Sequence, residues 1–217
     1  MPELDRLCRL MATRGSATLP DDRMRFINTE PSNLFFHSHS DIFVEEFINA
    51  TPEALRGKTV MEITERTVID DFPRAREIVK KLREAGFRIA IDDAGAGYSG
   101  LQTMVEIEPD FIKLDMSLTR HIEDSVVKQK LVKTLHDFCD SANVTLIAEG
   151  IETETQLESL RTLGVSFGQG YYFAHPGSPY PITEILEPAG DPVPRAAKGK
   201  SERKAKSEHK PDPDPVA

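Results

Sequence analysis

Hydrophobic positions along the chain follow two spacings that alternate. Short apolar runs, such as TVMEIT from Thr59 and FIKLD from Phe111, have the length and composition of strands. Between these runs, apolar residues recur every three or four positions, which is the period of one face of a helix. The pattern therefore predicts a chain in which strands and helices take turns.

About six strands are predicted, and almost every one is followed by a helix. The strands are expected to begin near Met24, Thr59, Phe87, Phe111, Val144 and Ser166. Helices are expected around Leu4–Met11, from Asp41, after Asp71, ahead of Pro109, over Val127–Ala142, after Thr153 and near Ile182–Leu186.

Three helix starts carry capping signals. Asp71 is a suitable N-cap with Pro73 in the first turn, and Ala75, Ile78, Val79 and Leu82 then form a stripe that we expect to be buried. Asp41 is the expected N-cap of an earlier helix. Thr153 with Gln156 matches the capping-box pattern, in which each side chain bonds the other's backbone.

Strict alternation of strands and helices predicts parallel strands joined by helical crossovers. Two α/β architectures fit this pattern. One is a doubly wound sheet, and the other is a (β/α)8 barrel that lacks some of its strands.

Composition narrows the class of protein. The 217 residues are enough for one ordinary domain, and a formal net charge of -9 disfavours binding of a nucleic acid polymer. Cys8 and Cys139 form no C-x-x-C pair, which favours a reduced, cytoplasmic setting. No signal peptide is evident, and no run approaches the roughly 18 apolar residues of a membrane span. We expect a barrel domain over residues 1–187 and a disordered tail over 188–217, where Pro and charged residues dominate.

Polar side chains stand at or near the end of each predicted strand. Because the carboxyl ends of parallel strands meet at one face, and that face holds the active site in barrels, we expect these side chains to gather there. They are Asn28, Glu62, Asp92, Asp93, Asp115, Glu149 and Gln169.

Several carboxylates and an amide, without a His or Cys cluster, are the ligand set of a hard cation such as Mg²⁺ or Mn²⁺. Lys113 lies two residues before Asp115 and shares its strand face, so it is a candidate for proton transfer or phosphate binding. Any single strand-terminal acid is more often a helix N-cap or a solvated loop residue than a functional group, whereas polar residues at all six strand ends together favour a site. Glu65 and Glu152 each follow a candidate ligand by three residues, so orientation of a loop, capping and direct chemistry all stay open for them.

Five segments in order resemble the later motifs of the EAL family. They are MEITE from Met61, IDDAGAGYSGL from Ile91, IKLD from Ile112, AEGIET from Ala148 and GQGYYF from Gly168. Members of that family are bacterial phosphodiesterases that linearise cyclic di-GMP with Mg²⁺ or Mn²⁺ in a (β/α)8-type barrel.

The resemblance implies a role for each candidate residue. Asn28, Glu62, Asp92 and Asp93 are similar to the family's metal ligands. Glu149 is similar to the residue that binds or activates the attacking water, and Lys113 to the active-site lysine. Glu152 is similar to a supporting polar residue of the catalytic group, and Gln169 and Asp115 are similar to residues that bind the substrate. Glu65 is similar to the glutamate that steadies the loop at DAGAGYSG.

The sequence also departs from the family pattern. No Glu-Ala-Leu segment lies ahead of Asn28, Ala94 stands where Phe is usual, and Ala96 stands where Thr is common. We therefore expect an incomplete barrel with open edges. Three explanations stay open: a degenerate remnant, a true start that lies upstream, and a second copy or a partner chain that completes the barrel. Hydrolysis of cyclic di-GMP is expected to be weak or lost. The alternatives are a non-catalytic cyclic di-GMP-binding or protein-interaction module and a nonfunctional fragment.

Overall fold

A computed structural model describes the backbone of residues 2–16, 20, 22–29, 34–35, 40–64, 69, 71–95 and 100–177. All of them belong to the first of two compact units, Met1–Leu186. The predicted tail at 188–217 and the predicted helix near Ile182–Leu186 lie outside the described residues, as does Glu65.

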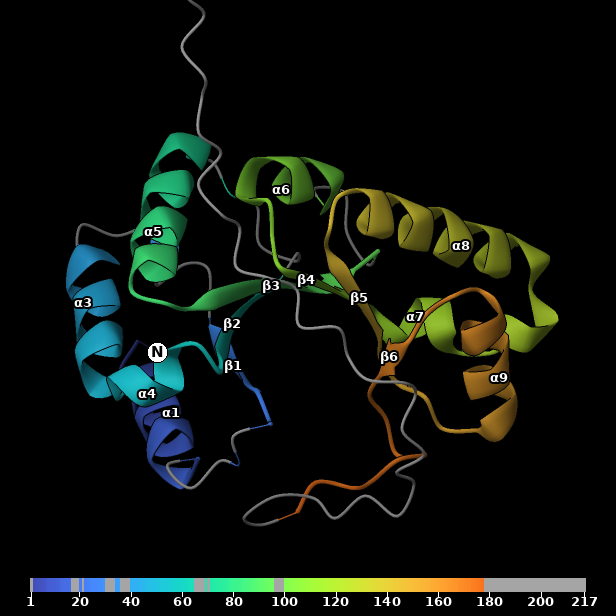
Figure 1. Ribbon diagram of the computed structural model, residues 1–217, viewed down its shortest axis with the longest axis horizontal. Coiled ribbons are helices and arrows are strands. Elements are labelled where there is room, and N and C mark those ends of the chain that lie inside the picture. The colour runs from blue at the N-terminus through green and yellow to red at the C-terminus, as the bar shows by residue number, and fades with distance from the viewer. Residues whose placement is uncertain are drawn as a thin grey trace, which may run out of the picture. The chain divides into compact units, whose positions relative to one another are not determined.

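The described part of the chain is built on one six-stranded parallel sheet. Its strands follow one another in chain order, so β1 and β6 form its two edges (Figure 1). The strands are β1 (Arg25–Thr29), β2 (Thr59–Thr64), β3 (Arg88–Ala94), β4 (Phe111–Leu114), β5 (Thr145–Ala148) and β6 (Phe167–Gly168). The parallel arrangement predicted from the alternation of strands and helices is confirmed.

Helices occupy the segments between the strands. They are α1 (Pro2–Gly15), α3 (Ser40–Ala50), α4 (Glu53–Arg56), α5 (Phe72–Glu84), α6 (Gly100–Ile107), α7 (Met116–Thr119), α8 (Val126–Ser141), α9 (Glu154–Thr162) and the 3-10 helix η1 (Ile122–Asp124). Figure 1 shows α3, α5, α6 and α8 along one face of the curved sheet. None of the described helices is long and apolar enough to cross a membrane.

Two of the predicted caps are present. The Asp71 carboxylate accepts a hydrogen bond from the Arg74 backbone N–H at 2.9 Å, and Thr153 with Gln156 forms a complete capping box at the start of α9. The predicted stripe of α5, from Ala75 to Leu82, is buried against the sheet. These caps satisfy backbone groups that a helix end leaves without partners.

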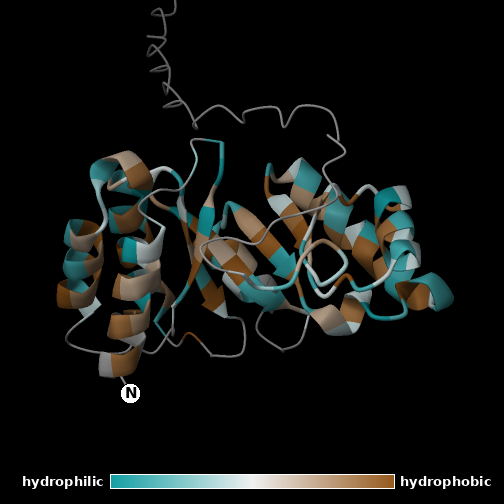
Figure 2. Ribbon diagram, turned by 90° about the horizontal axis from the view of Figure 1, so that it is seen from below, coloured by the Kyte–Doolittle hydropathy of each residue, from teal (hydrophilic) through white to brown (hydrophobic). Residues whose placement is uncertain are grey.

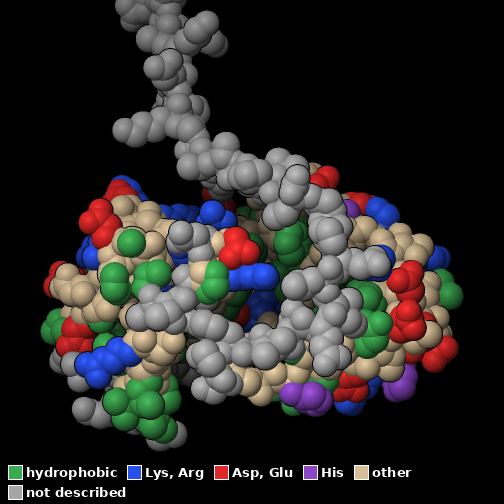
Figure 3. All heavy atoms as spheres, turned by 60° about the horizontal axis from the view of Figure 1, so that its bottom comes forward, with side chains coloured by type: hydrophobic (Ala, Val, Ile, Leu, Met, Phe, Trp, Pro, Cys, Tyr) green, Lys and Arg blue, Asp and Glu red, His purple; other side chains and the backbone are tan. Residues whose placement is uncertain are grey.

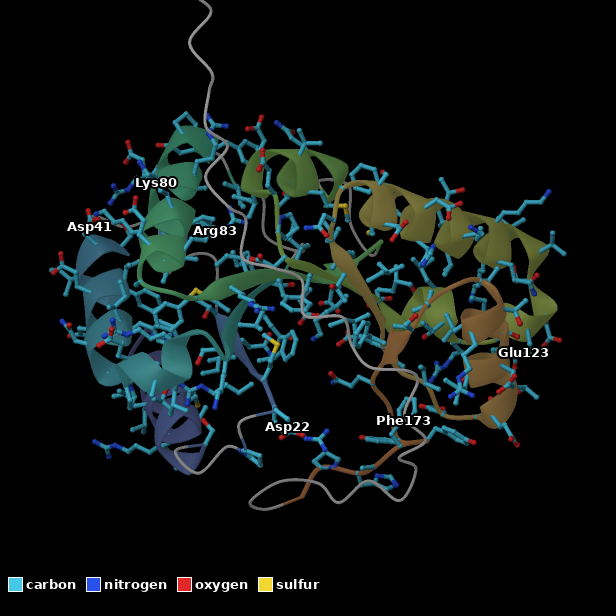
Figure 4. All side chains as sticks on the ribbon, viewed as in Figure 1. Asp22, Asp41, Lys80, Arg83, Glu123 and Phe173 are labelled. Carbon is cyan, nitrogen blue, oxygen red and sulfur yellow. The ribbon has the colours of Figure 1, made fainter. Side chains whose placement is uncertain are left out.

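The cap predicted at Asp41 is wrong. Helix α3 begins one residue earlier, at Ser40, and Asp41 lies inside its first turn. Its carboxylate instead bonds two side chains of α5, Lys81 at 2.5 Å and Arg74. Figure 4 shows Asp41 at the end of α3 that faces α5. A long-range ion pair has replaced the local cap, which the sequence alone does not reveal.

Helix α8 is present as predicted, but only some of its apolar residues pack on the sheet. Val127, Leu131 and Phe138 are 77, 43 and 42% exposed, whereas Val132 and Cys139 are buried. The helix therefore carries apolar residues on two faces, and among the described residues the sheet covers only one of them.

The strand predicted to begin near Ser166 is present, but it has only two residues. Strand β6 ends at Gly168, and the chain then folds back over Ile151, whose backbone N–H donates to the Gln169 carbonyl. A Cβ at Gly170 would lie 2.1 Å from the Ile151 carbonyl oxygen, so only glycine permits this close approach.

An apolar layer fills the inner side of the sheet near the start of its strands. Val60, Ala90 and Phe111 form this layer, with Met24 and Ile147 packed against it. Larger apolar clusters lie between the other face and the helices, and Figure 2 shows hydrophobic and hydrophilic residues mixed along the strands. Side chains on one face of a strand recur every two residues. Two residues after each residue of this layer, the next side chain on the same face therefore lies near the carboxyl end of its strand.

Candidate metal centre

The inward positions beyond the apolar layer are polar. Glu62 follows Val60 by two residues, Lys113 follows Phe111, and Glu149 follows Ile147. This step of two is the strand period, so an apolar layer and a polar layer are stacked on the same face. The sequence thereby places charged side chains near the strand ends, on the same face as the apolar layer and two residues beyond it.

Lys113 lies at the centre of this polar layer. Its Nζ is 2.5 Å from Glu62 Oε1, 2.9 Å from Asp92 Oδ1 and 2.6 Å from Glu149 Oε1. The side chain is almost fully buried, and the three carboxylates come from β2, β3 and the end of β5. One ammonium group therefore holds three acidic side chains together.

Burial and charge act in opposite directions on these groups. Burial lowers the pKa of Lys113, but the negative charges and hydrogen bonds of Glu62 and Glu149 outweigh it, so the pKa lies above its ordinary value. Burial raises the pKa of Glu62 and of Glu149, and the attraction of Lys113 offsets this only in part. The acidic side chains of this group, Glu62, Asp92, Asp93 and Glu149, also outnumber its one lysine.

Three carboxylates at the open side of this layer could share one cation. Asp92, Asp93 and Glu149 each offer an oxygen, and these oxygens lie within 4.8 Å of one another. All three side chains are half-buried.

A backbone irregularity allows Asp92 and Asp93 to join the same group. Successive residues of a regular strand point to opposite faces, but the pairing of β3 with β4 shifts register between Ile91 and Ala94. Asp93 has a φ of 58°, in the left-handed region, and its backbone N–H donates to Asp92 Oδ1 at 3.0 Å. Thr64 Oγ1 donates to Asp93 Oδ2 at 3.4 Å, which fixes the second carboxylate from β2.

The donor set fits a hard divalent cation. All of its ligand atoms are oxygens, and neither His nor Cys is among them, which favours Mg²⁺ or Mn²⁺ over zinc.

Asn28, Gln169 and Glu152, which the structure also describes, have more exposed surroundings than the Lys113-centred group. Asn28 is exposed on the edge strand β1, in register with Glu62 of β2. Gln169 and Glu152 are exposed, and the backbone N–H of Glu152 donates to Gln156 Oε1 at 2.8 Å. The roles predicted for Asn28, Gln169, Glu152 and Glu65 stay predictions.

Asp115 caps a helix, which is one of the roles that a strand-terminal acid can have. Its carboxylate accepts the Ser117 backbone N–H at 2.8 Å and caps α7, and the side chain is buried. Capping is the role that this contact shows, whereas substrate binding by Asp115 stays a prediction. Two threonines, Thr64 and Thr119, also reach site residues. No sequence pattern singled them out, because their partners become neighbours only through the sheet.

The chain matches the EAL domain family over residues 2–176. It is 32% identical over 152 residues to the probable cyclic di-GMP phosphodiesterase PdeG of Escherichia coli, an alignment that covers 69% of this chain and 30% of PdeG. It is 30% identical over 126 residues to the cyclic di-GMP phosphodiesterase PdeB of Shewanella oneidensis, covering 58% of this chain and 14% of PdeB. The chain thus spans under a third of either protein.

The fold of this chain is similar to solved structures of cyclic di-GMP complexes. A calcium and cyclic di-GMP complex of Klebsiella pneumoniae BlrP1 has a TM-score of 0.73 at 32% identity, covering 85% of this chain and 46% of that one. A cyclic di-GMP-bound EAL protein of Vibrio cholerae has a TM-score of 0.69 at 28% identity, covering 82% and 75%. The predicted fold class, an incomplete TIM-type barrel, is confirmed, and the chain belongs to the EAL domain family.

Proposed function

We propose that this chain acts in cyclic di-GMP signalling by binding the dinucleotide at its strand ends together with Mg²⁺ or Mn²⁺. We further propose that its hydrolysis of cyclic di-GMP to linear pGpG is weak or lost. The observation that carries the proposal is the Lys113-centred group, in which Glu62, Asp92 and Glu149 converge from three separate strand ends.

The anionic ligand needs local positive charge, because the chain carries a net charge of -9. Asp92, Asp93, Glu62 and Asn28 are the residues that would hold the cations. A divalent ion bound there supplies charge neutralisation of the phosphodiester and makes a water molecule more acidic.

Side chains of the chain itself would orient the water molecule, supply positive charge and contact the nucleotide. Glu149 lies beside both Lys113 and the Asp92–Asp93 pair, so it is placed to orient a water molecule against phosphorus. Lys113 supplies a fixed positive charge next to that water. Gln169 and Glu152, exposed near the same strand ends, are the candidates for contacts with the nucleotide.

Weak hydrolysis follows from the open sheet. The described strands run from β1 to β6 with two free edges, and Asn28 lies on one of those edges. An edge strand moves more than an interior strand, and a displacement of about 1 Å at a catalytic group can reduce a rate on the order of 100-fold. Binding tolerates such displacement better than bond cleavage does.

A partner is proposed for the same edges. A second copy of the chain, or another protein, would cover β1 and β6 and the half-exposed Phe26 and Phe167. Acidic and basic side chains are interspersed over the face shown in Figure 3, which does not favour a nucleic acid polymer as that partner. The two free cysteines and the nucleotide ligand favour the cytoplasm.

The alternative function is a non-catalytic regulatory module that binds cyclic di-GMP or another protein. The exposure of Asn28 at the sheet edge favours this alternative. A loosely held Asn28 would disturb the ligand geometry that bond cleavage needs, but it would leave the charge of the site unchanged.

Calorimetric titration of the purified chain with cyclic di-GMP, in Mn²⁺ and then in EDTA, tests the proposal of binding. We expect binding in Mn²⁺ that is lost in EDTA and in Asp92→Asn. Asp140→Asn, which changes an exposed acid on α8, serves as the control and should bind as wild type does. Equal binding in EDTA, or none in either condition, would contradict the proposed site.

A further inference from the structure

Helix α7 directly follows β4, the strand that carries Lys113, and its last residue contacts Glu149 at the end of β5. It begins immediately after β4, where Asp115 caps it through the Ser117 backbone N–H, and the Asp115 backbone N–H donates to the Ala94 carbonyl of β3. The start of this short helix is therefore fixed to the sheet from two sides.

The last residue of α7 contacts the backbone of the candidate metal centre. Thr119 is fully buried, and its hydroxyl donates to the carbonyl oxygen of Glu149, with the Met116 carbonyl also within reach at 3.1 Å. Gly150, which follows Glu149 in the chain, has a φ of 67°, and a Cβ at this glycine would lie 2.7 Å from Met116 Cβ. The Glu149–Gly150 peptide thus packs directly against α7.

This contact matters because Glu149 lies just outside the sheet ladder. Strand β5 ends at Ala148, whose carbonyl accepts the Gln169 N–H. In the peptide that follows, the Glu149 carbonyl is held by Thr119, while the carboxylate of the same residue lies 2.6 Å from Lys113. A rotation of that peptide would swing the carboxylate away from Lys113, Asp92 and Asp93.

We infer that Thr119 is a positioning residue, which holds the Glu149 backbone so that its carboxylate faces the Asp92–Asp93 pair. The inference rests on the proposed metal-dependent function and deepens it. Asp115 acts in the same assembly, because its cap fixes α7 and α7 presents Thr119. Outer contacts of this kind orient metal ligands, and their loss typically lowers metal affinity about 10- to 100-fold.

Two substitutions at Thr119 separate the hydroxyl from the packing. Thr119→Val keeps the branched shape and removes the donor, so we expect Mn²⁺ affinity, measured by calorimetry, to fall about 10- to 100-fold. Thr119→Ser keeps the donor and should restore most of that loss. Thr51→Val is the control, because Thr51 is equally buried, lies between α3 and α4 ahead of β2, and its hydroxyl contacts none of the proposed ligands. It should leave Mn²⁺ affinity unchanged.

A second readout does not depend on metal. The carbonyl ¹³C resonance of Glu149, in metal-free protein labelled at glutamate, should shift in Thr119→Val and return toward wild type in Thr119→Ser. An unchanged resonance in Thr119→Val would overturn the hydrogen bond. A shifted resonance with wild-type Mn²⁺ affinity would overturn the positioning role alone, whereas wild-type protein that binds no Mn²⁺ would overturn the proposed function and this inference with it.

Discussion

Lys113 of β4 and Glu62 of β2 form an ion pair at 2.5 Å across the strand that separates them, β3. Both side chains are nearly inaccessible to water, and Lys113 also contacts Asp92 and Glu149. One ammonium group is thus shared by three carboxylates, and removal of the lysine leaves all three without a positive partner at this position.

Lys113→Met should therefore reduce the free energy of unfolding. Loss of one partner from a buried ion pair costs about 3–5 kcal/mol, because the remaining charges stay buried without compensation. Urea denaturation in EDTA measures this, and added Mn²⁺ should recover part of the loss by supplying positive charge. Lys133→Met, which removes an exposed pair with Asp137, should cost at most about 1 kcal/mol. Equal effects of the two substitutions would contradict the central role of Lys113.

Substitutions of Asp93 should distinguish its backbone from its carboxylate. Asn tolerates the left-handed conformation at φ 58°, so Asp93→Asn should weaken Mn²⁺ binding with little change in thermal stability. Asp93→Val should in addition lower stability by about 1–2 kcal/mol, since a branched residue resists that conformation. Calorimetry with Mn²⁺ and thermal unfolding in EDTA report the two effects separately. Full Mn²⁺ affinity in Asp93→Asn would exclude Asp93 as a ligand.

The contact between α3 and α5 should depend on pH. Hydrogen bonds from Lys81 and Arg74 lower the pKa of Asp41 below 3.8. A lowered carboxyl pKa stabilises the folded state above the unfolded pKa, and this contribution is lost as pH falls through the folded pKa. The thermal midpoint of Asp41→Asn should thus lie below that of wild type near pH 7, and the two should converge below pH 3.8. A difference that stays constant with pH would show that the charge of Asp41 does not stabilise this contact.

Apolar residues of α5 and α8 should respond differently to truncation. Ile78 is fully buried, so Ile78→Ala should cost about 2–5 kcal/mol. Leu131→Ala removes a similar side chain from an exposed position and should change stability by less than about 0.5 kcal/mol. Chemical denaturation compares them directly. A large loss at Leu131 would mean that another chain covers the outer face of α8 under the conditions used.

Much of the fold could be predicted because its signals are local. The stripe from Ala75 to Leu82, the Asp71 cap and the strand that carries Asp92 follow from spacing and capping chemistry within a few residues. Strand-end acids could be assigned to one face for the same reason, since strict alternation leaves only parallel strands.

Features that depend on distant contacts could not be predicted. The register shift at Asp93 arises where β3 meets β4, and Thr119 reaches Glu149 only after α7 packs on the strand end. The outward stripe of α8 has the same period as a buried one, so spacing cannot tell which face meets the sheet. Asp41 likewise satisfies the pattern of a cap while serving a neighbouring helix.

The most direct test of the proposed function is turnover of cyclic di-GMP by the purified chain in Mn²⁺ or Mg²⁺, with formation of the linear dinucleotide followed by chromatography. Glu149→Gln is the control for the site, and binding is measured on the same samples. We predict that cyclic di-GMP binds and is converted far more slowly than about 1 s⁻¹, or not at all. Conversion at about 1 s⁻¹ or faster, abolished in Glu149→Gln, would contradict the account and would mean that the metal centre is complete despite the open edges of the sheet.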